Sequence, residues 1–500
     1  MFTDDMPLLA SVILIAHFAL LFVLALFGAH RLSIVVRWFR YRNYEPTVKN
    51  QFAVLPKVTV QVPMYNERYV AGRIVDTVAA LDYPSDRLQI QIVDDSNDET
   101  TDIVAKAVRC YQDQGVNIQH IQRSNRRGYK AGALRDAMAT ATGEFIAIFD
   151  ADFVPEPSLL LDTIHHFTDS RIGMVQFRWE HLNRFNSSLT STQAVMLDAH
   201  FSLEQQVRCA SGALLNFNGT AGIWRTGAIV DAGHWSADTL TEDLDLSYRA
   251  QLKGWRMLYL NHITCSGEIP SDANALKSQQ HRWAKGGIQV MLKILGTVWR
   301  SPRSLGDKVE STFHLSNNLA YFLVLTNTLF FLIPSLLIRE TYQLESLLWL
   351  DITLLMLSSG GHLVYFIFGQ IALGYPVWRT LIKIPSLLLL GIQLAFNNAR
   401  AALEALAGRK SGFVRTPKSG ELEKNIRKAL EQRTISRSLY QAVPPRGVLL
   451  ESALSITYAV VLCWAVLHEL WFMLPFLLLL IIGFATTAMD TWRSQQKINA

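Results

Sequence analysis

The sequence predicts a mixed α/β domain inserted between membrane-spanning helices, and three observations carry this prediction. Residues 7–29 contain no Lys, Arg, Asp or Glu, and at about 1.5 Å per residue they can cross a hydrocarbon core of about 30 Å. From residue 56 to about 270, short β-rich runs alternate with segments of helical length. After residue 312 the chain becomes strongly apolar again.

The apolar N-terminal segment is interpreted as a permanent anchor. It has neither the basic region nor the small-residue cleavage site of a removed signal peptide. Asp4 and Asp5 precede it, and arginines follow at positions 31, 37, 40 and 42. The positive-inside rule therefore places the N-terminus outside and the arginines in the cytoplasm. We expect residues 1–30 to span the membrane and 31–55 to form a basic cytosolic linker.

Charge and cysteine content narrow the class of protein. The net charge of +5 is modest, and basic residues lie mainly beside apolar segments, which favours contact with membrane lipids over nucleic acid. The cysteines are far apart and no pair has the spacing of metal ligands, so we expect a reduced cytosolic compartment without a disulfide framework or zinc site. They are Cys110, Cys209, Cys265 and Cys463.

The polar region predicts a mostly parallel sheet with helices on both faces. Expected strands are 57–63, 88–95, 116–122 and 143–152, and expected helices are 68–81, 98–113 and 129–141. Ligands of such sheets bind at the carboxyl ends of the strands. Four acidic residues fall at those ends, namely Asp94, Asp95, Asp150 and Asp152.

Further membrane spans are expected at about 313–338, 345–372, 447–467 and 470–490. The apolar segment 382–396 is a separate case. If it crossed the bilayer, the basic residues of 409–437 would lie outside, against the positive-inside rule. We therefore expect 376–408 to form a helix lying in the cytoplasmic interface.

Acidic residues supply the strongest chemical signal. Asp150 and Asp152, directly after an apolar strand, can hold Mg²⁺ or Mn²⁺ against a diphosphate; alternatively they are a solvated pair capping a helix near 156–168. Asp94 and Asp95 can accept hydrogen bonds from a base and a ribose, or form a turn with an N-cap. The segment 62–67, with Pro63, Tyr65 and Glu67, can close over a nucleotide or be a simple turn.

Three other groups are candidates for the reaction itself. Lys130 near a helix start can meet a phosphate, or be an ordinary exposed lysine. The run Thr241, Glu242 and Asp243 can provide a general base or a helix cap. In a helix, 279 and 282–283 share a face, so Arg282 can clamp a diphosphate while Trp283 stacks on a sugar. The alternative is an interfacial belt of Arg and Trp.

Taken in order, the motifs DDS, KAG, DAD, TED and QxxRW resemble the family 2 inverting glycosyltransferases, over residues 55–300. Within that family the runs FNGTAGIWR (217–225) and QQHRWAKG (279–286) are most similar to membrane-embedded cellulose, mannan and glucan synthases. The resemblance implies a GT-A fold for 56–300, ending in an interfacial helix, with a Mg²⁺ or Mn²⁺ cofactor.

The resemblance also implies residue roles, which are given together here. The residues expected to bind the donor are Pro63, Tyr65, Glu67, Asp94, Asp95, Lys130, Asp150, Gln279 and Arg282. Asp150 and Asp152 are expected to bind the metal, and Asp243 with Glu242 to carry out catalysis. Trp283 and Thr241 are expected to bind the acceptor. A gating loop, FxVTxK in cellulose synthases, corresponds to Phe413, Thr416 and Lys418, with Arg415 departing from the pattern.

The expected domains after residue 300 follow from the spans and this loop. They are two membrane helices (301–375), an interfacial helix with the gating-like loop (376–446), two more membrane helices (447–490) and a cytosolic tail (491–500). With only ten residues after 490, no C-terminal cyclic-dinucleotide-binding domain is expected. The chain is thus expected to be a multi-pass protein of a bacterial inner or plasma membrane, or of a Golgi-type membrane, with a cytosolic catalytic domain.

The predicted function is processive transfer of hexose from UDP-glucose or GDP-mannose to a growing β-glycan, with inversion and export. The alternatives are a single-addition enzyme that glycosylates a lipid acceptor and an inactive membrane scaffold. His17, Asp351 and His362 lie inside predicted spans, where ionisable residues often face a pathway. Asp351 lies near the outer end of its span and can alternatively reach water.

Overall fold

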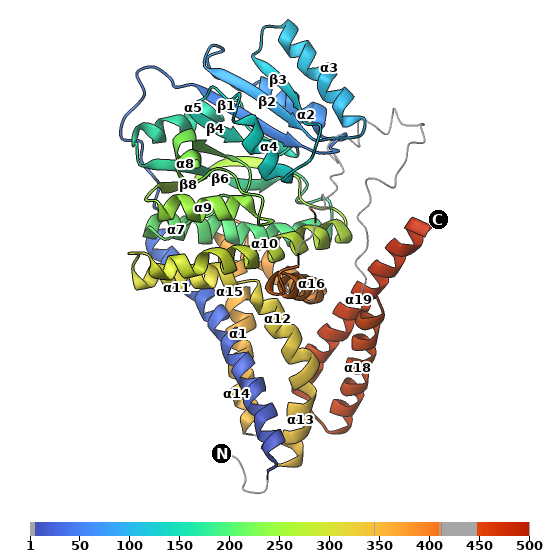
Figure 1. Ribbon diagram of the computed structural model, residues 1–500. Helices are drawn as coiled ribbons and strands as arrows, with labels where there is room; N and C mark the ends of the chain where they lie inside the picture. The colour runs from blue at the N-terminus through green and yellow to red at the C-terminus, as the bar shows by residue number, and fades with distance from the viewer. Residues whose placement is uncertain (1–5, 345, 410–411, 413–447, 500) are drawn as a thin grey trace.

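The computed structural model describes residues 6–344, 346–409, 412 and 448–499. An α/β domain forms one end of the molecule, and a group of long helices extends away from it to the other end (Figure 1). The first of these, α1 (Leu8–Tyr41), runs from the far end back to the α/β domain. Because α1 continues through Tyr41, the first residues of the predicted linker are helical.

The α/β domain contains an eight-stranded sheet in the order β3-β2-β1-β4-β7-β6-β8-β5. The strands β1 (Val58–Met64), β2 (Leu88–Asp94), β3 (Ile118–Gln122) and β4 (Phe145–Ile148) pair in parallel, as predicted. Beyond β4 the sheet is mixed. There β6 (Ile172–His181) pairs in parallel with β8 (Arg256–Gly267), whereas β7 (Gly222–Arg225) pairs antiparallel with β4 and β6, and β5 (Phe153–Val154) pairs antiparallel with β8.

Strand β4 explains why the sheet is buried on both faces. Successive side chains of a strand point to opposite faces, and all four residues of β4 are buried. Phe145 and Ala147 pack in the core with α2 (Ala71–Ala79), α3 (Thr100–Asp113) and α5 (Leu159–Ile164). Ile146 and Ile148 pack in the opposite core with α4 (Tyr129–Ala137), α8 (Thr226–Asp231) and α9 (Glu242–Leu252). A continuous apolar run therefore becomes a central strand.

A long helix that the sequence did not predict connects the sheet to the membrane helices. It consists of α6 (Ser188–Ala199), a π-helical turn η2 (His200–Gln205) and α7 (Gln206–Ser211). Ala199, Leu203 and Val207 pack against Ile34 and Val35 of α1. This helix therefore belongs to both the catalytic domain and the membrane-facing layer.

The predicted helix at the end of the domain is α10 (Ala273–Arg300). Asp272 caps it, because its carboxylate accepts hydrogen bonds from the backbone N–H groups of Asn274 and Ala275. Lys285 of α10 donates to Glu404 of α16 (Val377–Leu406) at 3.0 Å. In Figure 1 α16 is viewed almost end-on and so lies across the direction of α1 and α13 (Leu332–Thr341). By length and composition α16 could also cross a membrane, so the interfacial position stays a prediction.

Among the described residues, five helices are long and apolar enough to span a membrane, and a shorter apolar helix covers Leu474–Met489. The five are Leu8–Tyr41, Leu319–Thr341, Leu347–Ala372, Val377–Leu406 and Val448–Leu467. Two of them contain π-helical turns: η3 (Asn327–Phe331) separates α12 (Leu319–Thr326) from α13, and η4 (Met356–Gly360) separates α14 (Leu347–Leu355) from α15 (Gly361–Ala372). The predicted span 313–338 corresponds to the helix Leu319–Thr341. Its predicted first residue, 313, lies within the preceding helix α11 (Leu305–Ser316). The last two helices, α18 (Val448–Leu467) and α19 (Leu474–Asn499), pack together as a hairpin.

The ionisable residues predicted inside the spans pair with other side chains. His17 contacts Asn327 and Asp351 through its two ring nitrogens, each at 2.9 Å. Asp351 also pairs with Arg339 and is buried, so it does not reach water as the alternative proposed. His362 Nδ1 contacts the Ser358 carbonyl oxygen at 2.9 Å. The channel-lining role of all three stays a prediction.

Candidate active site

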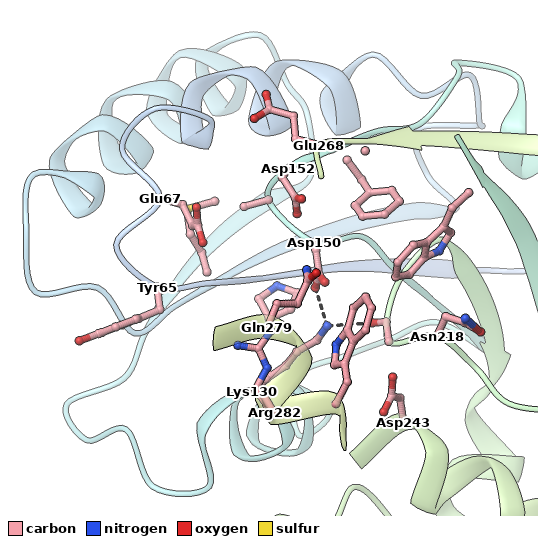
Figure 2. Close-up of a pocket in the computed structure, with 18 of the residues that line it drawn as sticks. Tyr65, Glu67, Lys130, Asp150, Asp152, Asn218, Asp243, Glu268, Gln279 and Arg282 are labelled. Atoms are coloured by element: carbon pink, nitrogen blue, oxygen red, sulfur yellow. Dashed lines mark hydrogen bonds and ion pairs between the residues drawn. The ribbon is translucent and has the colours of Figure 1, made fainter. Parts of the chain in front are cut away.

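A cavity opens at the carboxyl ends of β1 and β4, between the sheet, the start of α9 and one face of α10 (Figure 2). Most of the side chains predicted from the sequence line this cavity. They are Pro63, Tyr65, Glu67, Asp95, Lys130, Asp150, Asp152, Thr241, Glu242, Asp243, Gln279, Arg282 and Trp283. The predicted gating residues Phe413, Thr416 and Lys418 lie outside the described residues, although Gly412, just before them, approaches the Tyr129 hydroxyl.

The donor end of the cavity is defined here by Tyr65, Asp95 and Arg126. Asp95 is held by Arg123, whose Nε and Nη2 donate to its two carboxylate oxygens at 2.7 and 2.5 Å. The Arg126 guanidinium lies over the Tyr65 ring, 3.2 Å from its centroid. Planar groups and a fixed carboxylate together form a surface suited to a nucleoside.

Asp94 lies apart from the lining residues and has the contacts of the predicted turn. Its carboxylate accepts hydrogen bonds from the Ser96 N–H at 2.8 Å and the Thr101 hydroxyl at 3.0 Å, and contacts His120 Nε2 at 3.0 Å. Burial alone would raise the pKa of Asp94, but the bonds to His120, Ser96 and Thr101 outweigh it and lower the pKa. Asp94 therefore fixes the loop after β2, and direct contact with a nucleoside is better suited to Asp95.

Lys130 lies in the first turn of α4, deep in the cavity. Its ammonium donates to Asp150 at 2.5 Å and to the Gly219 carbonyl at 2.8 Å, as the dashed lines in Figure 2 show. Burial lowers the pKa of Lys130, but Asp150, Glu242 and Asp243 outweigh burial and raise it. The lysine therefore stays charged among three carboxylates, and the alternative of an ordinary exposed lysine is wrong.

Asp150 and Asp152 follow β4 and face the same cavity. The predicted alternative, a solvated pair capping a helix, does not describe them, because α5 begins after Ser158 and Asp152 is buried. In the described part of the chain, no group of three or more His, Cys, Asp or Glu side chains is arranged to hold a metal. A divalent cation here would rely on these two carboxylates together with phosphate and water oxygens, which is how Mg²⁺ is commonly bound. The residues present fit such an ion.

The acceptor end of the cavity is defined here by Asn218, Asp243 and Trp283. Asp243 lies in the first turn of α9, and burial together with the neighbouring Glu242 carboxylate raises its pKa from 3.8 to about 7. The pKa of Glu242 is also raised, chiefly by burial. A carboxylate with a pKa near the working pH is suited to general base catalysis.

Gly219 brings the main chain unusually close to the candidate base. Its φ of +83° is left-handed, and a Cβ placed there would lie 2.9 Å from Asp243 Oδ2 and 3.5 Å from Lys130 Nζ. A glycine is therefore required on both conformational and steric grounds. The loop before β7 consequently sets the position of Asp243 relative to Lys130.

Helix α10 supplies Gln279, Arg282 and Trp283 to the cavity from one face, as the spacing predicted. Burial lowers the pKa of Arg282, while Glu242, Asp150 and Asp243 act to raise it. The Asp150 carboxylate acts to raise the pKa of both Lys130 and Arg282, so two cationic side chains face it in the cavity.

Sequence reasoning missed part of the wall supplied by β6, β8 and the loop before β7. The missed residues of this wall include Trp179, Glu180, His181, Asn218 and Glu268, and Arg126 in the loop between β3 and α4 was missed as well. Two short signals were present, because WEH ends β6 and Glu268 directly follows β8. Polar residues at the ends of strands would have identified them once those strands were recognised.

Comparison with known proteins identifies the domain. Residues 56–286 match the family described as "Glycosyltransferase like family 2". The chain is 39% identical over 270 residues to glucomannan 4-beta-mannosyltransferase 7 of Arabidopsis thaliana, covering 53% of this chain and 49% of the relative. It is 43% identical over 268 residues to probable glucomannan 4-beta-mannosyltransferase 4 of Oryza sativa subsp. japonica, covering 53% and 48%. The chain thus spans about half the length of the curated relatives it matches.

A solved structure has a similar fold. The mannosyltransferase PcManGT from Pyrobaculum calidifontis, in complex with GDP-Man and Mn²⁺, gives a TM-score of 0.51 at 20% identity, covering 79% of this chain and all of that one. The mixed sheet and its flanking helices define a GT-A-type nucleotide-sugar transferase fold, as predicted. Residues 56–286 are thus similar to the family 2 glycosyltransferases, and the chain is similar to cellulose-synthase-like glucomannan mannosyltransferases.

Proposed function

We propose that this protein is an inverting, processive hexosyltransferase that extends a β-glycan from a nucleotide-diphospho-sugar at the cytoplasmic side of a membrane. The observation that carries the proposal is a carboxylate with a pKa of about 7, Asp243, in the cavity that also holds Lys130, Arg282, Asp150 and Asp152. GDP-mannose is the preferred donor, because the curated relatives are named as mannosyltransferases. UDP-glucose is the second candidate.

The donor is bound in an extended position along the cavity. The nucleoside lies at the donor end, between Tyr65 and Asp95, and the diphosphate lies toward Lys130, Arg282 and Gln279. Two cations can neutralise the charge of the departing nucleoside diphosphate. When donor enters, Lys130 exchanges its contact with Asp150 for one with phosphate.

A divalent cation is part of this proposal, with Asp150 and Asp152 as the residues that would hold it. When bound, such an ion polarises the diphosphate and stabilises it as a leaving group. Mg²⁺ and Mn²⁺ both accept oxygen ligands. The mannosyltransferase solved with Mn²⁺ makes manganese the first to test.

Asp243 acts as the base in a single displacement. Its carboxylate removes the proton from an acceptor hydroxyl, the acceptor oxygen bonds to the anomeric carbon, and the bond from that carbon to the diphosphate oxygen breaks. Attack from the face opposite the leaving group converts an α-linked donor into a β-linked product. Trp283 offers the acceptor sugar a flat apolar surface on which to stack.

The membrane topology is proposed on the same basis. The basic end of α1 lies beside the catalytic domain, where Arg31 pairs with Glu204 and Arg37 pairs with Glu310. By the positive-inside rule this end is cytoplasmic. Helix α16, packed across the base of α10, lies in the cytoplasmic interface, and the remaining long helices surround the path of the product.

The test is an assay of the full-length protein in nanodiscs with radiolabelled GDP-mannose or UDP-glucose and either Mn²⁺ or Mg²⁺. The expected product is a long polymer that β-mannanase, or β-glucanase for glucose, degrades. Label confined to a lipid-extractable monoglycoside would replace the polymer with a glycolipid product. Absence of transfer from both donors with both metals would reject the proposed activity.

A further inference from the structure

A chain of hydrogen bonds, half-buried at the cavity and buried at its far end, runs from the acceptor end of the cavity to the long apolar helices. It begins at Asn218 in the cavity wall, passes through His200 and Glu204 in the π-helical turn η2, and ends at Arg31 of α1 and Tyr365 of α15. Single π-helical turns within α-helices are uncommon and often mark functional sites. None of these contacts has a part in the transfer step described above.

Three further hydrogen bonds fix the position of Asn218. Its Oδ1 accepts from Gln205 Nε2 at 2.7 Å and from Asn216 Nδ2 at 3.0 Å. Its backbone N–H donates to Gln176 Oε1 at 2.9 Å. Rotating the amide by half a turn would lose both bonds to Oδ1, so Nδ2 is the group that faces His200.

These contacts assign the protonation of His200. An amide nitrogen only donates, so the 3.0 Å contact from Asn218 Nδ2 makes His200 Nε2 the acceptor. The ring proton then lies on Nδ1, which faces Glu204 Oε2 at 3.3 Å. His200 therefore connects a neutral amide in the cavity wall to a buried carboxylate.

Glu204 is the junction between the catalytic domain and the membrane helices. It is 4% exposed. Its oxygens accept from Arg208 at 2.7 Å, from Arg31 at 2.8 Å and from the Tyr365 hydroxyl at 3.1 Å. Arg31 also lies over the Tyr365 ring, 5.0 Å from its centroid. Arg31 of α1 and Tyr365 of α15 thus fix the Glu204 carboxylate, which in turn contacts His200.

We propose that His200 and Glu204 are positioning residues for glycosyl transfer: they fix Asn218, and with it the adjoining Gly219, so that the acceptor end of the cavity keeps its shape. This inference rests on the proposed function. Asn218 and Gly219 are consecutive. The Gly219 carbonyl accepts a hydrogen bond from Lys130 at 2.8 Å, and a Cβ at Gly219 would lie 2.9 Å from Asp243 Oδ2. Release of Asn218 therefore changes the setting of Asp243 toward the acceptor and, to a smaller extent, that of Lys130, while Tyr65, Asp95 and Arg126 at the nucleoside end have no member in this chain of contacts.

The test uses four variants of the full-length protein in nanodiscs. His200→Ala removes the acceptor for Asn218, and His200→Gln restores an oxygen at a similar distance from the main chain. Tyr365→Phe removes only the hydroxyl that donates to Glu204 and keeps the ring, so it tests the membrane end even if the His200 variants fold poorly. His262→Ala is the matched control, because His262 is exposed and pairs with Glu45 at 3.9 Å, away from the cavity lining.

The measurements are the dissociation constant of GDP, the kcat and acceptor KM of transfer, and the thermal unfolding temperature. We expect His200→Ala to lower transfer kcat about 10-fold, since a lost hydrogen bond to an amide has that order of effect. GDP affinity should fall by no more than about 2-fold, because only Lys130 among the donor-binding residues contacts Gly219. His200→Gln should recover most of this loss, Tyr365→Phe should lose about 2-fold, and His262→Ala should match the wild type.

Three results would overturn the inference. Wild-type transfer by His200→Ala would show that Asn218 needs no support. Parallel losses of GDP affinity, kcat and unfolding temperature would make the residue a general structural one. Absence of transfer by the wild type and by His262→Ala would reject the proposed function and this inference with it, and is distinguishable because it does not depend on the His200 substitution.

Discussion

The two ends of the cavity are built differently. At the donor end, Asp95 is fixed by Arg123, and both belong to the first half of the sheet domain. At the acceptor end, Asn218 is connected through His200 and Glu204 to membrane helices, and Trp283 projects from α10, which packs on α16. In the proposed function, donor binding therefore depends on contacts within the sheet domain, whereas the acceptor site also depends on contacts with long apolar helices such as α1 and α16.

The largest expected effect is at the acceptor end. Asp243→Asn should lower transfer by about 1,000-fold, in the middle of the range for loss of a general base, while GDP binding is retained. Single-turnover kinetics and GDP titration on the same preparation measure both quantities. Asp238→Asn, an exposed carboxylate near α9 that pairs with Lys293 at 2.9 Å, is the control. Retained turnover in Asp243→Asn would assign the base elsewhere.

A substitution at the donor end should raise the donor KM rather than lower kcat. Asp95→Asn weakens the paired bonds to Arg123 and should raise the donor KM about 10-fold with little change in kcat, because charge-assisted hydrogen bonds contribute roughly 1.5–3 kcal/mol. Asp86→Asn, at an exposed carboxylate that pairs only with its neighbour Arg87 at 3.2 Å, serves as the matched control. If Asp95→Asn lowers kcat alone, the two ends are not separable and the comparison fails.

The pH dependence sharpens the assignment of Asp243. A base must be ionised to accept a proton, and the pKa of Asp243 is raised from 3.8 to about 7. Transfer should therefore rise with pH and level off above pH 7, with about a 10-fold loss for each unit below it. Steady-state rates at saturating donor across this range are the measurement. A profile that is flat through neutral pH would contradict the pKa and the role together.

The smallest expected effect is on stability. Because folding raises the pKa of Asp243, the folded state binds its proton more tightly, and stability is lost as the pH rises through about 7. Asparagine cannot ionise, so Asp243→Asn should unfold at a temperature about 2 °C or more above wild type at pH 8, with a smaller gain at pH 5. Scanning fluorimetry in detergent at both values tests this, and Asp238→Asn should show no such gain.

The parallel half of the fold was predictable because its strands are apolar runs that end in acids. Strand β4 is buried on both faces, so its run is continuous, and Asp150 and Asp152 follow it at once. Strand β7 has only four residues, and β6 ends in half-buried side chains that are mostly polar, so neither has a clear pattern.

The role of each residue within a motif was harder to predict from the sequence than the motif itself. Asp94 is the last residue of β2, and neighbouring side chains at a strand end point to opposite sides. One of the two aspartates therefore enters the turn while the other faces the cavity, and the sequence contains no signal that says which. His200 and Asn218 could not be paired at all, because tertiary packing alone brings their segments together.

The pairing of Arg31 with Glu204 also has a consequence for biosynthesis. These two residues are 173 positions apart in the chain. At about 5–20 residues per second, a ribosome that has made Arg31 needs roughly 9–35 s to make its partner. In the proposed topology, the guanidinium is expected to stay in the hydrated headgroup layer during that interval, since a lone charge is costly in hydrocarbon. The N-terminal helix consequently reaches its final depth and contacts only after much of the catalytic domain has been translated, so the order of synthesis favours folding of that domain before the membrane helices close around α1.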